Sequence, residues 1–187
     1  MQLQKSLLTA TLLAAGSLAA VSANAAGTAS GIIDVTLNIT SVCTVDTASL
    51  SAADINFGTV AAGTAPAQGV SAANVSVQCS TNSPYVINLT PINVPSSTGA
   101  GVMNRVGSGT DTVAYQLRQA TGTTAAVWGN TGTLVNGTAT PGNAVVGTGT
   151  GATATATTHT IYATVDATAT DVQPGDYKDT VTVAVIY

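Results

Sequence analysis

The stretch Tyr177-Lys-Asp-Thr-Val-Thr-Val-Ala-Val-Ile-Tyr187 decides the fold expected for this chain. Its apolar residues recur at every second position, which is typical of a β-strand with one buried face. Four side chains, Val181, Val183, Val185 and Tyr187, are predicted to share that face. No complementary strand stands beside this stretch in the sequence, so we expect it to need a neighbour from elsewhere.

A second stripe with the same period lies near the N-terminus, where Ile33, Val35, Leu37 and Ile39 alternate with polar residues. A strand with one apolar face and two free edges needs partners, and another copy of the chain could supply them. The stripe could instead be the first strand of a self-contained sandwich, pairing with that chain's own last strand. The residues alone leave both interpretations open.

Residues 1–25 are expected to be a cleaved export signal. Lys5 precedes an apolar run from Leu7 to Val21, and Ser22-Ala-Asn-Ala25 offers an Ala-x-Ala cleavage site. A membrane anchor is the alternative, but Thr, Gly and Ser interrupt the run, which is short for a membrane span. No later run of membrane length follows, so we expect no membrane insertion after cleavage.

Composition predicts an all-β domain. Thr, Ala, Gly and Val dominate, Glu is absent, and only 6% of residues are charged. β-Branched residues favour strands, and roughly 160 residues without the leader suffice for one domain with a sizeable core. The net charge is then about −5, because eight Asp face Arg105, Arg118 and Lys178. This balance argues against nucleic acid and anionic membranes as partners.

The chain has two cysteines, Cys43 and Cys79. In an exported protein they are expected to form one disulfide. Closing a loop of that length contributes roughly 4 kcal/mol in the chain-entropy model. Two unpaired thiols are the alternative. A zinc site is disfavoured because His159 is the only histidine.

Eight strands are expected, at about 32–40, 54–60, 70–79, 84–90, 112–119, 125–129, 158–166 and 177–187. Short strands without helical periodicity suggest a β-sandwich. Two stretches look poor in structure. Pro91 to Gly109 reads as a polar connection, and Asn130 to Thr157 as either a mobile loop or a padded hairpin.

Several segments together resemble the spore coat protein U domain, the domain of archaic (Csu-type) chaperone–usher pilins. The stretch Gly175 to Val185 is similar to that family's closing motif. Further matches follow in order: Ile55-Asn-Phe-Gly58, Asn74-Val-Ser-Val-Gln-Cys79 leading into Tyr85-Val-Ile-Asn-Leu89, Ala114-Tyr-Gln-Leu117, and Val127-Trp-Gly129. The run Ile33 to Ile39, closely before Cys43, resembles the start of a mature Csu-type major pilin. A Thr/Gly/Ala insertion around 137–157 departs from the pattern.

The resemblance implies an incomplete immunoglobulin-like β-sandwich, completed by a donor strand from another subunit. It implies a signal peptide at 1–25, an N-terminal donor strand extension at 26–41 and a pilin domain at 42–187. A periplasmic chaperone would first lend a strand, and at the outer-membrane usher the next subunit's extension would replace it. The implied donor residues are Ile33, Val35, Leu37 and Ile39, and the implied acceptor groove edge is Val181, Val183, Val185 and Tyr187.

Simple energetics support that assignment. Burial of four aliphatic side chains contributes roughly 6–12 kcal/mol gross. A strand inserted between two edges also satisfies backbone groups on both of its sides. Only Ser41 and Val42 separate the donor run from Cys43. If the disulfide fixes Cys43 to the domain, that linker is too short to fold the strand back easily.

No residue set in the sequence points to catalysis, and no cofactor or metal is expected. His159 is predicted to be a surface or loop residue rather than a catalytic base, since no Ser or Cys is visibly set up with it. Trp128 is predicted to lie in the core or to close a hairpin. Asp176 and Asp179 are predicted to cap a turn, with subunit contact as the alternative.

The leading hypothesis is a non-enzymatic rod-type pilin that polymerises with like subunits at the cell surface. By resemblance, such fibres serve surface attachment and biofilm formation. A secreted coat-type component of the same domain family is the first alternative. A self-contained exported β-sandwich binding module is the second.

Overall fold

The computed structural model describes residues 28–46, 54–70, 74–107 and 109–187. The expected signal peptide at 1–25 lies outside these residues. The chain divides into two units, Met1–Asn38 and Ile39–Tyr187, which we describe separately. We call the second unit the body. No helix among the described residues is long and apolar enough to cross a membrane.

In the first unit, residues 28–38 form no regular secondary structure. The strand expected at 32–40 is therefore not formed within this single chain, since a strand needs a hydrogen-bonded neighbour. The side chains of Ile33, Val35 and Leu37 are 87%, 93% and 84% exposed. Such exposure of alternate aliphatic residues is unusual in a folded chain.

The described residues of the body are all-β apart from one 3-10 helix, η1 (Ala167–Thr170). Four sheets build it, and their strand pairs are antiparallel. The first has the order β1 (Cys43–Val45), β3 (Val75–Cys79), β10 (Thr157–His159). The second has the order β12 (Tyr177–Lys178), β5 (Ala100–Arg105), β6 (Thr112–Arg118), β11 (Tyr162–Thr164), β2 (Gly69–Val70). The third has the order β13 (Val181–Ile186), β4 (Pro84–Pro91), β9 (Val145–Thr148), and the last is the hairpin β7 (Thr133–Val135), β8 (Thr138–Thr140).

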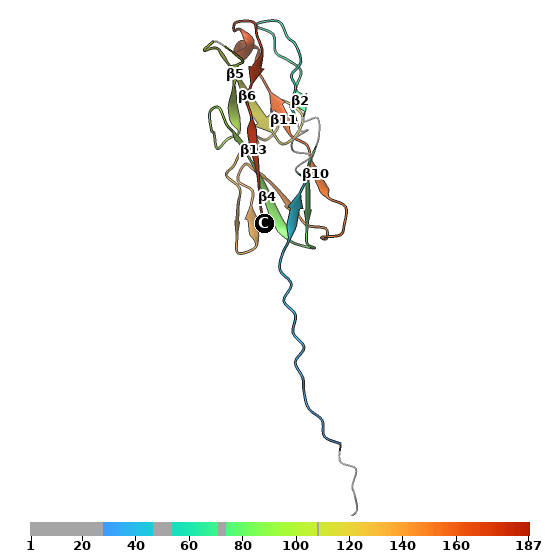
Figure 1. The fold of residues 1–187 in the computed structure, drawn as a ribbon. Helices are drawn as coiled ribbons and strands as arrows, with labels where there is room; N and C mark the ends of the chain where they lie inside the picture. Colours follow the sequence, from blue (N-terminus) through green and yellow to red (C-terminus); the bar gives the residue numbers. More distant parts are fainter. Residues whose placement is uncertain (1–27, 47–53, 71–73, 108) are drawn as a thin grey trace, which may run out of the picture. The chain divides into compact units, whose positions relative to one another are not determined.

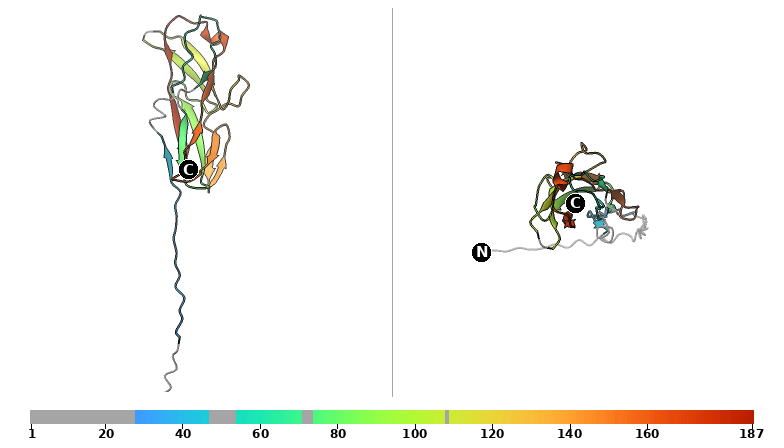
Figure 2. Two further views of the ribbon diagram at one scale, coloured as in Figure 1. Left: turned by 90° about the vertical axis from the view of Figure 1, so that its right-hand side faces the viewer. Right: turned by 90° about the horizontal axis from the view of Figure 1, so that it is seen from above.

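These sheets enclose a common interior (Figures 1 and 2). Alternate residues of β3, β4 and β6 meet in one core cluster, together with Ile161, Ala163 and Val165 from β11 and its flanks. Trp128 lies in this core, as predicted, and its indole Nε1 donates a hydrogen bond to the Ile87 carbonyl at 2.8 Å. The arrangement confirms the predicted all-β sandwich.

The predicted disulfide is present. Cys43 and Cys79 are directly opposite in the β1–β3 ladder, with Cα atoms 4.0 Å apart. The two residues before Cys43 are also held. The Val42 amide donates to Ser80 Oγ, the Ser80 amide donates to the Val42 carbonyl, and Ser41 Oγ donates to Ser83 Oγ. From Ser41 onward the chain is therefore attached to β3 and the turn that follows it.

Two stretches predicted to lack structure contain strands. β5 lies within the expected connection Pro91 to Gly109, and its pairing with β6 compensates for its poor strand composition. The low-complexity stretch forms the β7–β8 hairpin and β9, so the hairpin alternative was right. Asn136 and Gly137 have φ of 49° and 71°, as required at the centre of a type I′ turn. This Asn-Gly pair was a hairpin signal that the sequence interpretation missed.

Other predicted strands were wrong in extent. Residues 54–60 form no extended strand, and 125–129 contribute only an isolated bridge from Val127 to Arg118. The expected strand 158–166 is divided between β10 and β11, which belong to different sheets. The expected strand 177–187 is similarly divided into β12 and β13. Of the strand expected at 70–79, residues 71–73 lie outside the described residues.

Candidate functional site

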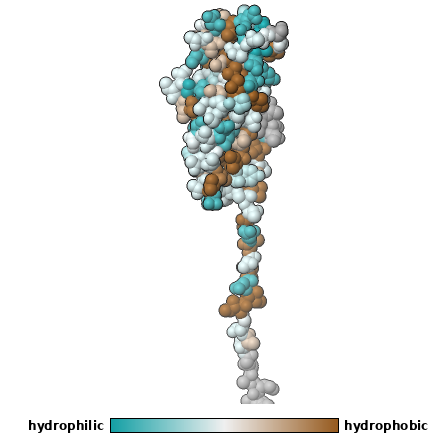
Figure 3. All heavy atoms as spheres, turned by 90° about the vertical axis from the view of Figure 1, so that its left-hand side faces the viewer, coloured by the Kyte–Doolittle hydropathy of each residue, from teal (hydrophilic) through white to brown (hydrophobic). Residues whose placement is uncertain are grey.

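A groove of about 920 Å³ with an apolar floor lies beside the last strand of the body. Its floor is made by side chains of β5, β6 and β11 and their flanks, namely Met103, Val113, Tyr115, Leu117, Ile161, Ala163 and Val165. Two chain segments complete its lining, residues 54–62 and residues 172–181 with Val183. The space-filling view shows apolar atoms exposed on the body surface (Figure 3).

β13 and the segment 54–62 both have backbone groups that make no hydrogen bond to any described residue. β13 is the outer strand of its sheet and pairs only with β4 among the described strands. In the segment 54–62, the amides and carbonyls of Phe57, Thr59 and Val60 make no hydrogen bond within the described part of the chain. Ile55 and Phe57 nevertheless pack against the core, with Gly69 leaving room for both side chains. The groove therefore combines an apolar floor with unpaired backbone.

The predicted groove-edge residues do not all reach this cavity. Val181 and Val183 line it. Val185 packs against the core cluster without lining the cavity. Tyr187 is 56% exposed and also lies outside the cavity lining.

The predicted donor residues are not gathered into any site within their own unit. Ile33, Val35 and Leu37 are largely exposed, and so is Ile39, the first residue of the body, at 80%. In the space-filling view, apolar and polar residues alternate along this segment (Figure 3).

Sequence interpretation missed a polar contact at the groove. The Tyr115 hydroxyl donates a 2.8 Å hydrogen bond to Asp179 Oδ2, and both residues line the cavity. Burial raises the pKa of Tyr115 far above its usual value, and the neighbouring Asp179 raises it further. Asp179 does cap its own turn, since its Oδ1 accepts from the Thr180 amide at 2.7 Å.

His159 is not the surface or loop residue that the sequence predicted. It is part of β10, is half-buried, and its Nε2 lies 2.8 Å from the hydroxyl of the buried Tyr85. Burial lowers the pKa of His159 and raises that of Tyr85. Among the described residues, no three of His, Cys, Asp and Glu lie close enough together to hold a metal ion.

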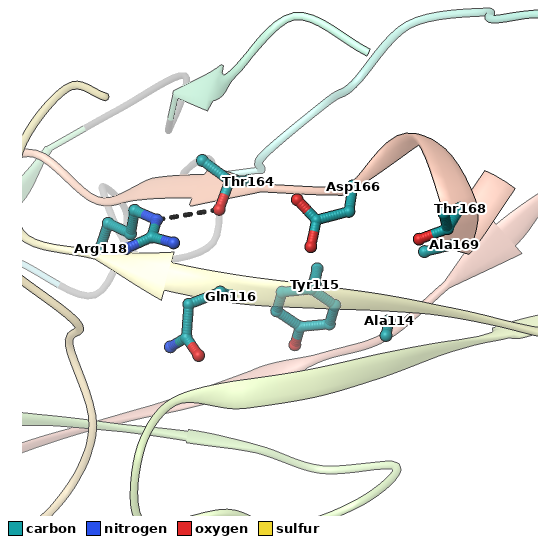
Figure 4. Close-up of a pocket in the computed structure, with 8 residues that line it drawn as sticks. All are labelled: Ala114, Tyr115, Gln116, Arg118, Thr164, Asp166, Thr168 and Ala169. Carbon is teal, nitrogen blue, oxygen red and sulfur yellow. Dashed lines mark hydrogen bonds between the residues drawn. The ribbon is translucent and has the colours of Figure 1, made fainter. Parts of the chain in front are cut away.

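A smaller pocket of about 300 Å³ lies over β6 and β11 (Figure 4). Its polar lining comes from Gln116, Arg118, Thr164, Asp166 and Thr168. Arg118 donates from Nε to Thr164 Oγ1 and from Nη1 to the Ala125 carbonyl. These bonds tie Arg118 into the sheet, which gives this residue a structural role.

Comparison with known proteins identifies the family. The profile of the Spore Coat Protein U domain matches residues 29–184, almost the whole described chain. The chain therefore belongs to the Spore Coat Protein U domain family, as the resemblance predicted. No curated protein matches the chain.

Two solved structures are distantly similar. One is the CsuC–CsuE chaperone–tip adhesion subunit pre-assembly complex from archaic chaperone–usher Csu pili of Acinetobacter baumannii. It is 20% identical with a TM-score of 0.46, over 80% of this chain and 40% of that chain. The other is a chaperone–tip adhesin complex of CFA/I fimbriae. It is 14% identical with a TM-score of 0.38, over 71% of this chain and 38% of that chain. This chain spans less than half the length of either.

Proposed function

We propose that this protein is a structural, non-enzymatic subunit of a chaperone–usher pilus, exported through the periplasm to the cell surface. Like subunits join by donor-strand complementation, in which the segment Ile33–Ile39 of one copy fills the groove of another. The observation that carries the proposal is the groove itself, a cavity with an apolar floor, beside two segments whose backbone is not fully paired among the described residues. Membership of the Spore Coat Protein U domain family supports it.

A β-strand is the ligand that suits this groove. Along β13, and at Phe57, Thr59 and Val60, amides and carbonyls without a partner among the described residues need hydrogen bonds once water is excluded. An inserted strand offers such bonds on both sides. Its inward side chains would meet Leu117, Ile161 and Val165 on the floor. Seven residues in a strand span about 23 Å, and the groove lining includes nine consecutive residues from 54 to 62.

The donor segment supplies the matching chemistry. Ile33, Val35, Leu37 and Ile39 are 80% or more exposed, so almost all of their apolar surface remains available for burial. Burying four such side chains contributes roughly 6–12 kcal/mol gross. An empty groove and an exposed apolar arm are both aggregation liabilities, which is why a periplasmic chaperone and an outer-membrane usher belong to the proposal.

The attachment of the chain immediately after the donor segment Ile33–Ile39 favours insertion of that segment into another copy. The chain is attached to the body from Ser41, through its bond to Ser83 and through the Val42–Ser80 pair. Only Thr40 then separates the donor run from the attached chain. Even the tightest common hairpin needs two loop residues. The donor segment therefore has too little free chain after it to turn back and enter the groove of its own copy.

A donor strand together with an acceptor groove suits a position within the rod, where each subunit both gives and receives a strand. We therefore propose a rod-type subunit of a fibre that serves surface attachment and biofilm formation. A self-contained exported sandwich is the competing function, and it predicts a stable monomer.

The test is a charge on the apolar face of the donor segment. Leu37→Asp should abolish the denaturant-resistant polymer, because a carboxylate would have to enter the apolar groove, while the folded body is retained. Asn38→Asp is the matched control, since it adds the same charge on the other face of the strand and should still polymerise. Size-exclusion chromatography and gel electrophoresis without heating report the polymer, and circular dichroism reports the fold. Polymers that persist in Leu37→Asp, or a stable partner-free monomer of the wild type, would overturn the proposal.

A further inference from the structure

One polar cluster stands where the last strand changes sheets. Asp179 lies between β12, which pairs with β5, and β13, which pairs with β4. Its carboxylate accepts three hydrogen bonds, from the Tyr115 hydroxyl at 2.8 Å, the Asn93 amide at 3.0 Å and the Thr180 amide at 2.7 Å. Bonds to an ionised acceptor are stronger than neutral ones, so this carboxylate fixes the crossing firmly.

Asn93 fixes the same crossing from its other side. Its side-chain amide donates to the carbonyls of Lys178 and Val102, both at 2.9 Å. The neighbouring Ile92 amide donates to the Thr180 carbonyl at 2.9 Å. The connection between β4 and β5 thus holds the backbone on both sides of Asp179.

Tyr115 connects this crossing to the groove floor. It belongs to β6, is 8% exposed, and lines the groove together with Val181 and Val183. Directly opposite it in the β5–β6 ladder is Gly101. A Cβ atom at that position would collide with the Tyr115 ring, including its hydroxyl oxygen. Gly101 therefore allows the ring to lie across β5, from where its hydroxyl reaches Asp179.

We propose that Tyr115, Gly101 and Asp179 form a strand-switch clamp that holds the start of β13 at the edge of the groove, ready to pair with an incoming apolar β-strand. This inference rests on the proposed function and assigns positioning residues to its site. Closure of the empty groove would lower the free energy of the body, because Val181 and Val183 could bury their exposed surface against the floor. The clamp opposes that closure, since it ties the β12–β13 crossing both to the floor and to the β4–β5 connection. Without the clamp, a donor strand must first displace the beginning of β13.

The experiment compares strand acceptance by full-length subunits purified as complexes with their chaperone. The probe is a synthetic peptide of residues 28–40, and capture is followed by the fluorescence anisotropy of a dye on that peptide. Tyr115→Phe removes only the hydroxyl and should slow capture about tenfold, the size expected for loss of one hydrogen bond to a charged group. Gly101→Ala should slow capture similarly by displacing the ring.

Tyr177→Phe is the matched control. Tyr177 also lines the groove, but its hydroxyl donates to the Gln173 carbonyl within its own loop. This variant should capture the peptide at the wild-type rate. Asp179→Asn keeps an oxygen acceptor for the amides of Asn93 and Thr180, so it should fall between the wild type and Tyr115→Phe.

The outcomes separate the clamp from the function itself. If the wild type captures no peptide, the proposed function fails. If the wild type captures it and Tyr115→Phe does so equally fast, only the clamp is overturned. Equal slowing in Tyr177→Phe would also overturn the clamp, because loss of any groove hydroxyl would then suffice. Should Gly101→Ala fail to fold, Tyr115→Phe alone decides.

Discussion

β4 and β13 are neighbours in one sheet, pair over six residues and carry similar aliphatic side chains. They nevertheless differ, because among the described strands β4 is buried and paired on both edges and β13 is not. β4 has a partner on each edge, and Tyr85, Val86, Ile87 and Leu89 are fully buried. β13 has β4 on one edge, and its residues alternate between half-buried and exposed. The contrast shows that the burial of a strand and the pairing of both its edges depend on its neighbours more than on its composition.

The second face of β4 shows what β13 lacks. The chain at Gly132 covers this face, because the Gly132 amide donates to Asn88 Oδ1 at 3.1 Å and Asn88 Nδ2 donates to the Gly132 carbonyl at 3.0 Å. At Gly132 an added Cβ would collide with Val86, so the covering chain packs tightly. Val183, in contrast, packs against the core cluster but stays half-buried and lines the groove. The comparison can be tested from the completed side and from the open side.

The largest effect is expected at the disulfide, which joins β1 to β3, the strand that precedes β4 in the chain. Replacing Cys43 and Cys79 by Ala should cost roughly 4 kcal/mol of unfolding free energy, from the freed loop in the chain-entropy model. Urea-induced unfolding followed by Trp128 fluorescence measures this loss. Unchanged stability in the double variant would mean that the β1–β3 ladder holds without the covalent link.

The next effect is expected in β4. Ile87→Ala should destabilise the body by about 3 kcal/mol, because a fully buried side chain leaves a cavity that the packed surroundings cannot fill. Polymerisation should be affected only through this loss of stability. Equilibrium unfolding in urea gives the free energy, and a loss well under that for Val183→Ala would contradict the comparison.

A smaller effect on stability is expected at the open side. Val183→Ala should cost the unfolding free energy of the unpolymerised body only about 1 kcal/mol, since its side chain is half-buried beside an empty groove. The same change should weaken the polymer more visibly, seen as a lower temperature of polymer dissociation. Thr182→Ala, on the exposed face of β13, is the control and should change neither quantity.

The smallest effect concerns pH and the contact of Tyr85 with His159. Burial lowers the pKa of His159 in the folded body below its unfolded value near 6.5, so folding favours the neutral imidazole. This contribution to stability is complete above about pH 6.5 and is lost as the pH falls through the lowered pKa. Melting temperatures at pH 8 and pH 5 should therefore differ less in His159→Gln than in the wild type. An equal difference in both would show that His159 does not titrate with unfolding.

Much of the fold followed from local pattern. Alternation in Val75–Cys79 and in Val113, Tyr115 and Leu117 reports one buried face directly. β6 was therefore predicted almost to the residue, and β3 occupies the second half of the strand expected at 70–79. β5 was missed because Gly101 and Asn104 are poor strand formers. Their strand exists because β6 lies beside it and the Tyr115 ring covers the glycine. That cause is a tertiary contact, which no local pattern carries.

The candidate site was predicted in part. The apolar stripe of β13 pointed to Val181 and Val183, and both line the groove. The pattern also included Val185 and Tyr187, because periodicity continues past the point where the cavity ends. The contact of Tyr115 with Asp179 joins residues 64 positions apart and depends on where the last strand changes sheets. The spacing of residues in the sequence does not predict where the chain passes from one sheet to another.

The sequence by itself determined the all-β class and the two apolar stripes, because composition and period-two alternation carry them. The Cys43–Cys79 pairing followed from the cysteine count, and the family from the resemblance of several ordered segments. Only the tertiary structure decided which stretches found partners. Pairing partners come from distant parts of the chain. β4 and β13 differ because, among the described strands, the fold brings a partner to both edges of β4 and to one edge of β13. Whether an apolar strand is paired on both edges or keeps one edge unpaired depends on the neighbours that the fold places beside it.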